Sequence, residues 1–304
     1  MSIKNYFVIA TVIILTAILS LAPHGLILQY CPNPSGVPIL EVQSRLPDGL
    51  NFLLFLSVVT CCFLIYCILQ NYLNTRIFFV RSLWFTLLLL AFHGALRQPI
   101  MNLIVGLHFN HALVIFFSEN LMFIICALWL CWVMPIAECQ SKMRLLYYST
   151  AFFFTTLITF FGSQAGHWVR NSFLPLLPPM DQSHIVMPPY EINVLIPTYM
   201  TFIEPGLASF IIFHFLKGKL HNFSTLTQGF IMAALIVSER IGPFLGVFYS
   251  EGNIFYRIFY YGQFLWEYLT LGILTVYGTR FIIQQVNSPW IDKKNNLSHK
   301  ELYV

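Results

Sequence analysis

Long apolar stretches separated by short polar segments dominate the hydropathy pattern of this chain. About 20 consecutive apolar residues are needed for a helix to cross the hydrocarbon core of a bilayer. Eight stretches of about this length occur, at residues 6–28, 50–70, 81–105, 112–136, 145–163, 193–216, 226–249 and 255–283. The pattern therefore predicts an all-α, polytopic integral membrane helical bundle with about eight transmembrane helices in one domain, followed by a polar tail at residues 285–304.

The distribution of lysine and arginine predicts how this bundle is oriented, because cytoplasmic loops carry an excess of both. With a cytoplasmic N-terminus, four basic residues fall on or near the outside: Arg45, Arg97, Arg170 and Arg257. Eleven fall on the inside: Lys4, Arg76, Arg81, Lys142, Arg144, Lys217, Lys219, Arg280, Lys293, Lys294 and Lys300. Both termini are therefore expected in the cytoplasm, with the chain in the inner (plasma) membrane of a cell.

The first apolar stretch has a second interpretation. Lys4, the apolar run and Ser20-Leu21-Ala22 resemble a signal peptide with a small-residue cleavage site. Cleavage there would make Pro23 the first mature residue, which is disfavoured, and the apolar run continues to Leu28. We expect an uncleaved helix, with the cleaved signal peptide as the alternative.

The composition agrees with a membrane protein and excludes several other classes. The chain of 304 residues is 58% hydrophobic and only 9% charged, with a mean hydropathy of +0.73. A soluble domain contains about 25% charged residues. No basic run is long enough to indicate a nucleic-acid partner. The seven cysteines contain no CxxC pair and lie mostly in apolar runs, so we expect buried apolar side chains rather than a disulfide framework.

Four glutamates, Glu119, Glu204, Glu239 and Glu267, lie inside the predicted spans. A charge at the bilayer centre costs about 2.5–3.5 kcal/mol, so such residues are rare and usually functional. At 1.5 Å per residue, the predicted topology places all four about seven to twelve residues from the outer ends of their helices. The depths predict one polar layer, which also includes the polar residues on nearby helix faces: His93, Arg97, Arg240, Tyr260 and Gln263.

The cations assigned to this layer do not balance its carboxylates. Arg97 and Arg240 supply two positive charges against four negative ones, which leaves a formal surplus of two negative charges. Buried carboxylates without a partner take up protons or bind a cation. His93 precedes Arg97 by one helical turn, so both would face the same partner, and His93 could neutralise part of the surplus when protonated.

Three prolines, Pro99, Pro205 and Pro243, follow charged residues of the layer at a separation of four residues or fewer. A proline inside a helix removes one hydrogen bond and kinks or breaks the helix. Charged side chains beside broken helices at mid-depth are typical of transporter sites. We therefore expect discontinuous helices next to the layer.

A GxxxG spacing, Gly162 to Gly166, includes Ser163 and is followed by His167. Because it comes at the predicted end of the fifth span, it indicates close helix packing followed by a loop over residues 164–192. Serine-based catalysis by Ser163 and His167 is the alternative that this position disfavours.

These features predict a small multi-pass carrier that binds a metal cation or protons, coupled to a small polar or ionic substrate. Glu204, Glu239 and Glu267 would bind the ion or proton, and Glu119 would lie beside the outer entrance. The two arginines would hold the carboxylates or engage an anionic group of the substrate. Besides the bilayer, a homodimer or a partner subunit is expected, because eight helices in 304 residues is small for a lone carrier.

Two other functions use the same polar layer. One is a membrane-embedded metal- or haem-dependent enzyme or redox protein, since His108 and His111 have a metal-ligand spacing above Glu119. His24, His93 and His111 could supply haem ligands from separate helices in this alternative. The other is a non-catalytic membrane subunit in which the layer only fixes helix packing.

Overall fold

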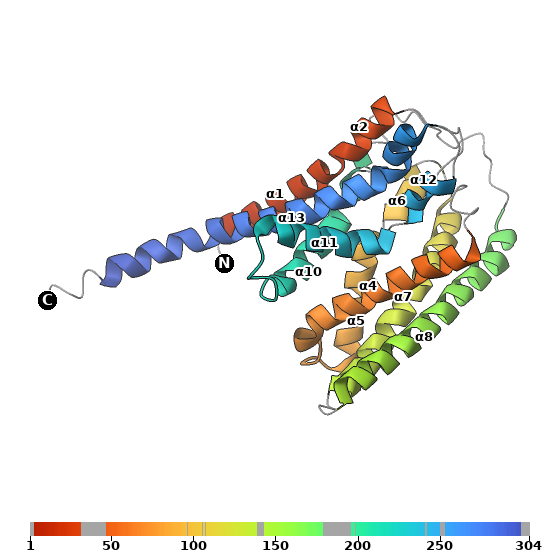
Figure 1. Cartoon of the computed structure of the whole chain (residues 1–304), viewed down its shortest axis with the longest axis horizontal. Helices are drawn as coiled ribbons and strands as arrows, with labels where there is room; N and C mark the ends of the chain where they lie inside the picture. Colours follow the sequence, from red (N-terminus) through yellow and green to blue (C-terminus); the bar gives the residue numbers. More distant parts are fainter. Residues whose placement is uncertain are drawn as a thin grey trace.

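The computed structural model describes residues 3–31, 47–95, 97–104, 106, 108–138, 143–178, 196–197, 199–240, 242–249 and 253–298. Within these ranges the chain is helical and contains no strand, which confirms the all-α prediction. Residues 32–46 and residues 179–192 of the predicted loop at 164–192 lie outside the described residues. The α-helices follow one another as α1 (Ile3–Ser20), α2 (Ala22–Tyr30), α4 (Asp48–Leu73), α5 (Phe78–His93), α6 (Arg97–Ile104), α7 (Phe109–Glu138), α8 (Arg144–Phe173), α10 (Ile203–Leu216), α11 (Thr225–Arg240), α12 (Gly246–Tyr249) and α13 (Ile254–Ser298) (Figure 1).

Several of these helices have the length and composition of membrane spans. Four stretches, Ile3–Ile27, Gly49–Leu73, Phe109–Ile136 and Leu145–Leu176, are long and apolar enough to cross a bilayer. Three shorter apolar helices accompany them: Phe78–His93, Ile203–Leu216 and Thr225–Glu239. The chain is thus a helical protein with several apolar helices that can span a membrane.

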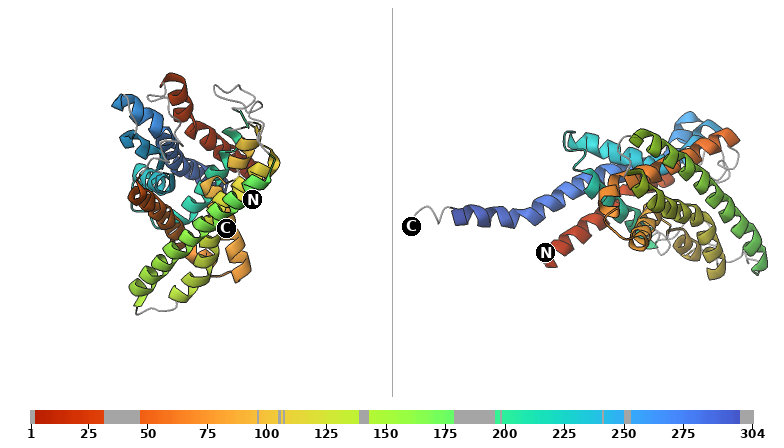
Figure 2. Two further views of the ribbon diagram at one scale, coloured as in Figure 1. Left: turned by 90° about the vertical axis from the view of Figure 1, so that its right-hand side faces the viewer. Right: turned by 90° about the horizontal axis from the view of Figure 1, so that it is seen from below.

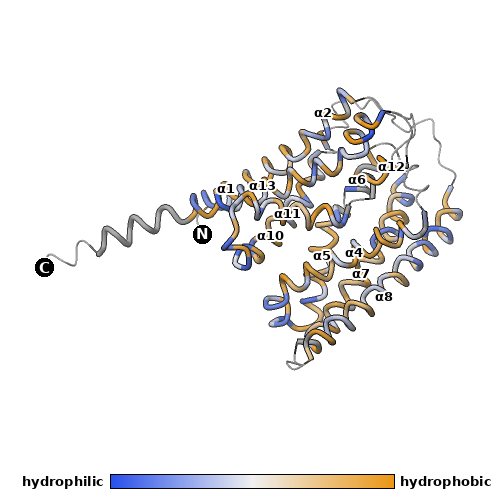
Figure 3. Tube along the Cα trace, viewed as in Figure 1, coloured by the Kyte–Doolittle hydropathy of each residue, from blue (hydrophilic) through white to orange (hydrophobic). Residues whose placement is uncertain are grey.

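The outer surface of the bundle has the character expected of a lipid-facing surface. Large apolar side chains such as Phe153, Phe161 and Trp132 are exposed on α7 and α8. Hydrophobic residues predominate along most helices (Figure 3). Water-soluble proteins rarely expose a contiguous apolar surface of this kind.

Two glycines let α8 approach α7 closely. A Cβ at Gly162 would lie 3.1 Å from the Met122 Cα, and a Cβ at Gly166 would overlap the Ser118 carbonyl. α8 therefore packs directly on the α7 backbone and continues through Gly166 to Phe173, which corrects the predicted helix end at residue 163. The interhelical contact outweighs the low helix propensity of glycine. The GxxxG packing itself is as predicted.

Helix breaks occur at all three places where prolines predict them. α5 ends at His93, where Gly94 takes a left-handed conformation with φ 70°, and α6 begins at Arg97. α11 ends at Arg240 and is followed by the 3₁₀-helix η4, Gly242–Leu245. α10 begins only at Ile203, so Glu204 lies in its first turn. The breaks lie within the predicted spans at 81–105, 193–216 and 226–249, as the expectation of discontinuous helices requires.

The last helix is longer than the pattern predicts. α13 has 45 residues and continues past the predicted end at residue 283 to Ser298. Its C-terminal turns project away from the bundle (Figure 2). The predicted polar tail at 285–304 is thus helical as far as Ser298, and residues 299–304 lie outside the described residues.

Candidate functional site

Glu267 forms the centre of a buried ionic cluster that joins three helices. Its side chain is 0% exposed, and its Oε1 accepts a hydrogen bond of 3.3 Å from Arg97 Nη1 at the start of α6. Its Oε2 lies 3.1 Å from His24 Nδ1 on α2. The Arg97 guanidinium also lies over the Phe202 ring, 5.0 Å from the centroid, in a cation–π arrangement. One carboxylate on α13 therefore fixes the positions of α2 and α6.

The same cluster contains polar atoms that no described residue satisfies. His24 Nδ1 and Glu267 Oε2 are close but lack the alignment of a hydrogen bond, and within the described ranges neither has another partner. Gln263 Oε1, one turn earlier on α13, is buried and also lacks a partner in the described part of the chain. Buried polar groups in proteins are normally hydrogen-bonded. The unsatisfied atoms therefore mark the surroundings of Glu267 as a candidate polar site.

Glu239 forms a second buried pair with His93, which joins α11 to the end of α5. His93 Nδ1 and Glu239 Oε1 are hydrogen-bonded, and the imidazole packs on Phe123 with ring centroids 4.2 Å apart. Two donors from α4 hold the neighbouring α11 backbone: Ser57 Oγ and Cys61 Sγ donate to carbonyls at 2.7 and 3.3 Å. Contacts from α4 and α5 thus hold the end of α11 that carries the carboxylate.

His93 also lines a polar cavity of about 240 Å³ between α7 and α8. Glu119 and Arg170 face each other in its lining, with Oε1 and Nη1 3.5 Å apart. These side chains remain 35% and 48% exposed, in contrast to Glu239 and Glu267. The other lining residues are Ser118, Met122, Ser163, Gly166 and His167. The cavity therefore connects an accessible ion pair with the imidazole that holds buried Glu239.

The observed partners change the charge balance expected for the layer. Glu119 contacts Arg170, and Glu267 contacts both Arg97 and His24. Glu239 contacts His93, so two of the four cationic partners are histidines. A histidine carries the compensating charge only when protonated. The net charge of these three clusters therefore depends on whether His24 and His93 carry a second ring proton.

The break between α5 and α6 corrects one expectation about the layer. His93 and Arg97 do not share a face of one helix, because the left-handed turn at Gly94 redirects the chain between them. The two side chains consequently reach different carboxylates, Glu239 and Glu267.

The other residues of the predicted layer are placed as follows. Glu204 is half-buried in the first turn of α10, where the helix dipole favours a carboxylate. Gln263 is buried one turn before Glu267, and Tyr260 is half-buried one turn further back. The Arg240 side chain lies outside the described residues, so its predicted role stays a prediction.

The histidine pair proposed as a metal site lies at the start of α7. His111 is buried and His108 is exposed, with ring centroids 6.0 Å apart. Among the residues that the structure describes, no three His, Cys, Asp or Glu side chains are grouped so that they could hold a metal ion. Metal binding by His108 and His111 therefore stays a prediction.

The predicted polar layer did not include two residues that contact its carboxylates, His24 and Arg170. His24 lies in the first apolar stretch, and an intramembrane histidine by itself indicates a polar site. Arg170 was assigned to a loop, but Ser163, Gly166, His167 and Arg170 follow helical spacing. Extending that periodicity past the glycines would have placed Arg170 on the face of α8 that contains Ser163.

Comparisons of the chain with protein-family models, curated proteins and solved structures found no match in any of the three.

Replacing Arg170 by glutamine is expected to change the free energy of unfolding by less than about 1 kcal/mol, because both partners of its ion pair with Glu119 are partly exposed. Unfolding by SDS in mixed micelles, compared between the wild type and Arg170→Gln, measures this change. A loss of several kcal/mol would mean that the pair holds α7 and α8 together rather than lining an accessible cavity.

Proposed function

We propose that the protein is a small multi-pass membrane carrier that couples the movement of protons or a cation to that of a small polar solute. The proposal rests on the two contacts that His93 makes. The imidazole lines the accessible α7–α8 cavity and also holds the buried carboxylate of Glu239. A proton on this pair is therefore in contact with both the cavity and the interior of the bundle.

The cavity is the proposed solute site. Its lining offers a carboxylate, a guanidinium, two imidazoles and two hydroxyls, from Glu119, Arg170, His93, His167 and two serines. This set suits a small solute with groups of either charge. The volume of about 240 Å³ is below the range of about 300–1,000 Å³ typical for drug-sized ligands.

Coupling would act through the charge of the two histidine–carboxylate pairs. Binding of a charged solute beside Glu119 and Arg170 changes the field at His93, and with it the occupancy of its proton. The His24–Glu267–Arg97 cluster supplies a second protonatable site in the bundle. Both helices that carry the pair end at a break, α5 at His93 and α11 at Arg240. Such breaks would let α5 and α11 move relative to the segments that follow them.

The orientation in the membrane is part of this proposal. Three of the eight proposed spans each combine two helices: α1 with α2, α5 with α6, and α11 with α12. The other five spans are single helices: α4, α7, α8, α10 and α13. Both termini then lie in the cytoplasm of a cell with this protein in its inner membrane. The α7–α8 cavity would open toward the outer side, where the positive-inside rule places Arg170.

Solute-driven proton movement into proteoliposomes tests the function. Liposomes containing a pH-sensitive dye are exposed to amino acids, small amines and alkali cations in turn. We expect at least one of them to change the internal pH with the wild type. We also expect Glu239→Gln and His93→Gln to reduce the rate at least about a hundredfold, the lower end of the range for a positioned proton-transfer group.

The matched control is Glu138→Gln, at the last residue of α7 and 19 residues from Glu119. This variant should retain the wild-type rate. The proposal is wrong if no solute moves protons, or if the His93 and Glu239 variants are as active as the control. Variants that lose folding together with activity would instead indicate that the pairs only fix helix packing.

A further inference from the structure

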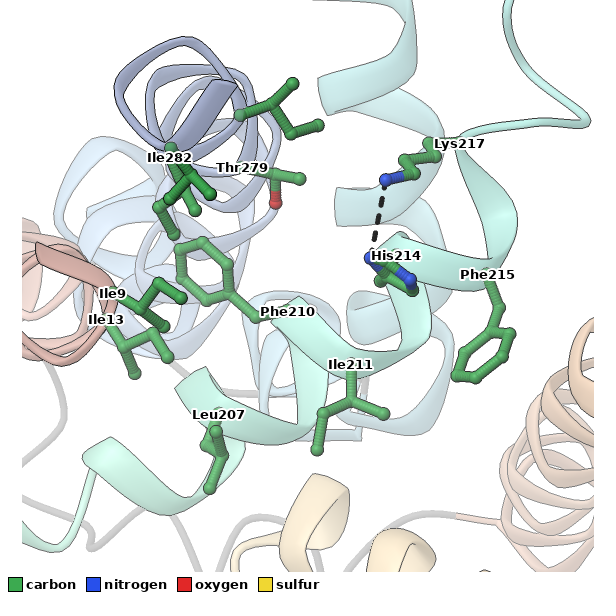
Figure 4. A pocket seen from close by; sticks show the side chains of 12 residues that line it. Ile9, Ile13, Leu207, Phe210, Ile211, His214, Phe215, Lys217, Thr279 and Ile282 are labelled. Atoms are coloured by element: carbon green, nitrogen blue, oxygen red, sulfur yellow. Dashed lines mark hydrogen bonds between the residues drawn. The ribbon is translucent and has the colours of Figure 1, made fainter. Parts of the chain in front are cut away.

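A groove of about 540 Å³ runs between α1, α10 and α13, away from the three ionic clusters. Its walls are almost entirely aliphatic and aromatic: Ile9, Ile13, Leu207, Phe210, Ile211 and Ile282 form most of the surface (Figure 4). Along α10 the lining extends from Leu207 to Lys217, which is about 15 Å at the rise of a helix. The groove therefore has the length and surface of a site for part of an acyl chain.

One end of the groove is cationic. Lys217 Nζ lies 3.3 Å from His214 Nδ1, and the Thr279 side chain faces the same end (Figure 4). A second cavity of about 250 Å³ shares Lys217 and Thr279 and adds Arg280 and His221. Within the described part of the chain, neither Lys217 nor Arg280 forms an ion pair with a carboxylate. This end thus presents uncompensated positive charge beside an apolar slot.

We propose that the groove binds one anionic phospholipid. An acyl chain lies between Leu207 and Ile9, and the phosphate contacts the Lys217 amine with Arg280 beside it. Basic side chains at the edge of a bilayer attract anionic headgroups, and lysine binds phosphate as a point charge. A zwitterionic headgroup fits less well, because no carboxylate lines either cavity to pair with its cation. The proposal does not depend on the transport function.

The basic residues also determine which leaflet supplies this lipid. Lys217, Lys219 and Arg280 belong to segments that the positive-inside rule places in the cytoplasm. The occupant is therefore an anionic lipid of the cytoplasmic leaflet.

Native mass spectrometry of the full chain in detergent tests this assignment. The protein is titrated with phosphatidylglycerol and with phosphatidylcholine of the same acyl chains. We expect one phosphatidylglycerol to bind preferentially, and Lys217→Gln to weaken its binding about fivefold, as expected for one basic residue near a membrane surface. Lys219→Gln is the matched control, because the Lys219 amine donates to the Cys67 carbonyl at 3.0 Å and lines neither cavity.

A second variant tests the apolar part of the site. Ile9→Trp places a larger side chain in the groove without changing charge, and it should also weaken phosphatidylglycerol binding. Equal binding of the two lipids, or equal effects of Lys217→Gln and Lys219→Gln, would overturn the proposal. The proposal would also be wrong if millimolar inorganic phosphate displaced the lipid completely and Ile9→Trp bound phosphatidylglycerol as well as the wild type does. The site would then bind phosphate alone.

Discussion

Replacing Glu267 by glutamine is expected to lower the free energy of unfolding by about 3 kcal/mol. The wild-type carboxylate is fully buried and contacts Arg97 and His24. Without it, the Arg97 guanidinium keeps its charge in the bundle and loses its counter-ion. Removal of one partner of a buried pair costs about 3–5 kcal/mol. The lower end applies here, because Arg97 retains 17% of its side-chain exposure.

SDS-induced unfolding in mixed micelles measures this loss, and a double variant identifies its cause. Arg97→Gln combined with Glu267→Gln removes both charges, so it should be more stable than Glu267→Gln alone. Glu119→Gln provides a control, since the partly exposed pair with Arg170 contributes less than about 1 kcal/mol. If Glu267→Gln and Glu119→Gln are equally stable, the Glu267 cluster does not behave as a buried ion pair.

Replacing Gly272 by alanine is expected to destabilise the protein by about 3 kcal/mol, although alanine is the better helix former. A Cβ at Gly272 would overlap the backbone of α11 at Ala233. Backbone atoms cannot move aside as a flexible side chain can, so α11 and α13 must separate. Gly229 on α11 also lies close to the α13 backbone, because a Cβ at Gly229 would be 3.1 Å from the Ile273 Cα. The separation would also displace Glu239 and Glu267, which these helices carry.

The same unfolding assay tests this prediction against Gly49→Ala. A Cβ at Gly49, in the first turn of α4, meets no atom within 4 Å, so this variant should be neutral or more stable by up to about 1 kcal/mol. Equal stability of the two alanine variants would contradict a close backbone contact between α11 and α13.

Local rules were sufficient for the features that depend on neighbouring residues. The three breaks beside Arg97, Glu204 and Glu239 could be predicted because proline and glycine limit the backbone wherever the chain packs. Helix ends were less predictable. α8 continues through Gly166 because the α7 backbone lies against it, and that contact does not appear in the local sequence.

Partner choice between charged residues was not predictable in the same way. His93 and Arg97 were expected to share one partner, but the turn at Gly94 directs them to Glu239 and Glu267. Arg170 is more than 50 residues away in sequence from its partner Glu119. His24 is more than 200 residues away from its partner Glu267. Only the packing of the helices brings such pairs together.

The amino-acid sequence by itself determined the helical class, the presence of several apolar helices that can span a membrane, and the positions of charges that are costly to bury. These properties follow from hydropathy and backbone restrictions, which act residue by residue. The tertiary structure decided which cation meets which carboxylate, and it formed the cavity that His93 shares with Glu119. It did so because side chains far apart in sequence meet only where the helices that carry them pack together, as α7 and α8 do at Gly162 and Gly166.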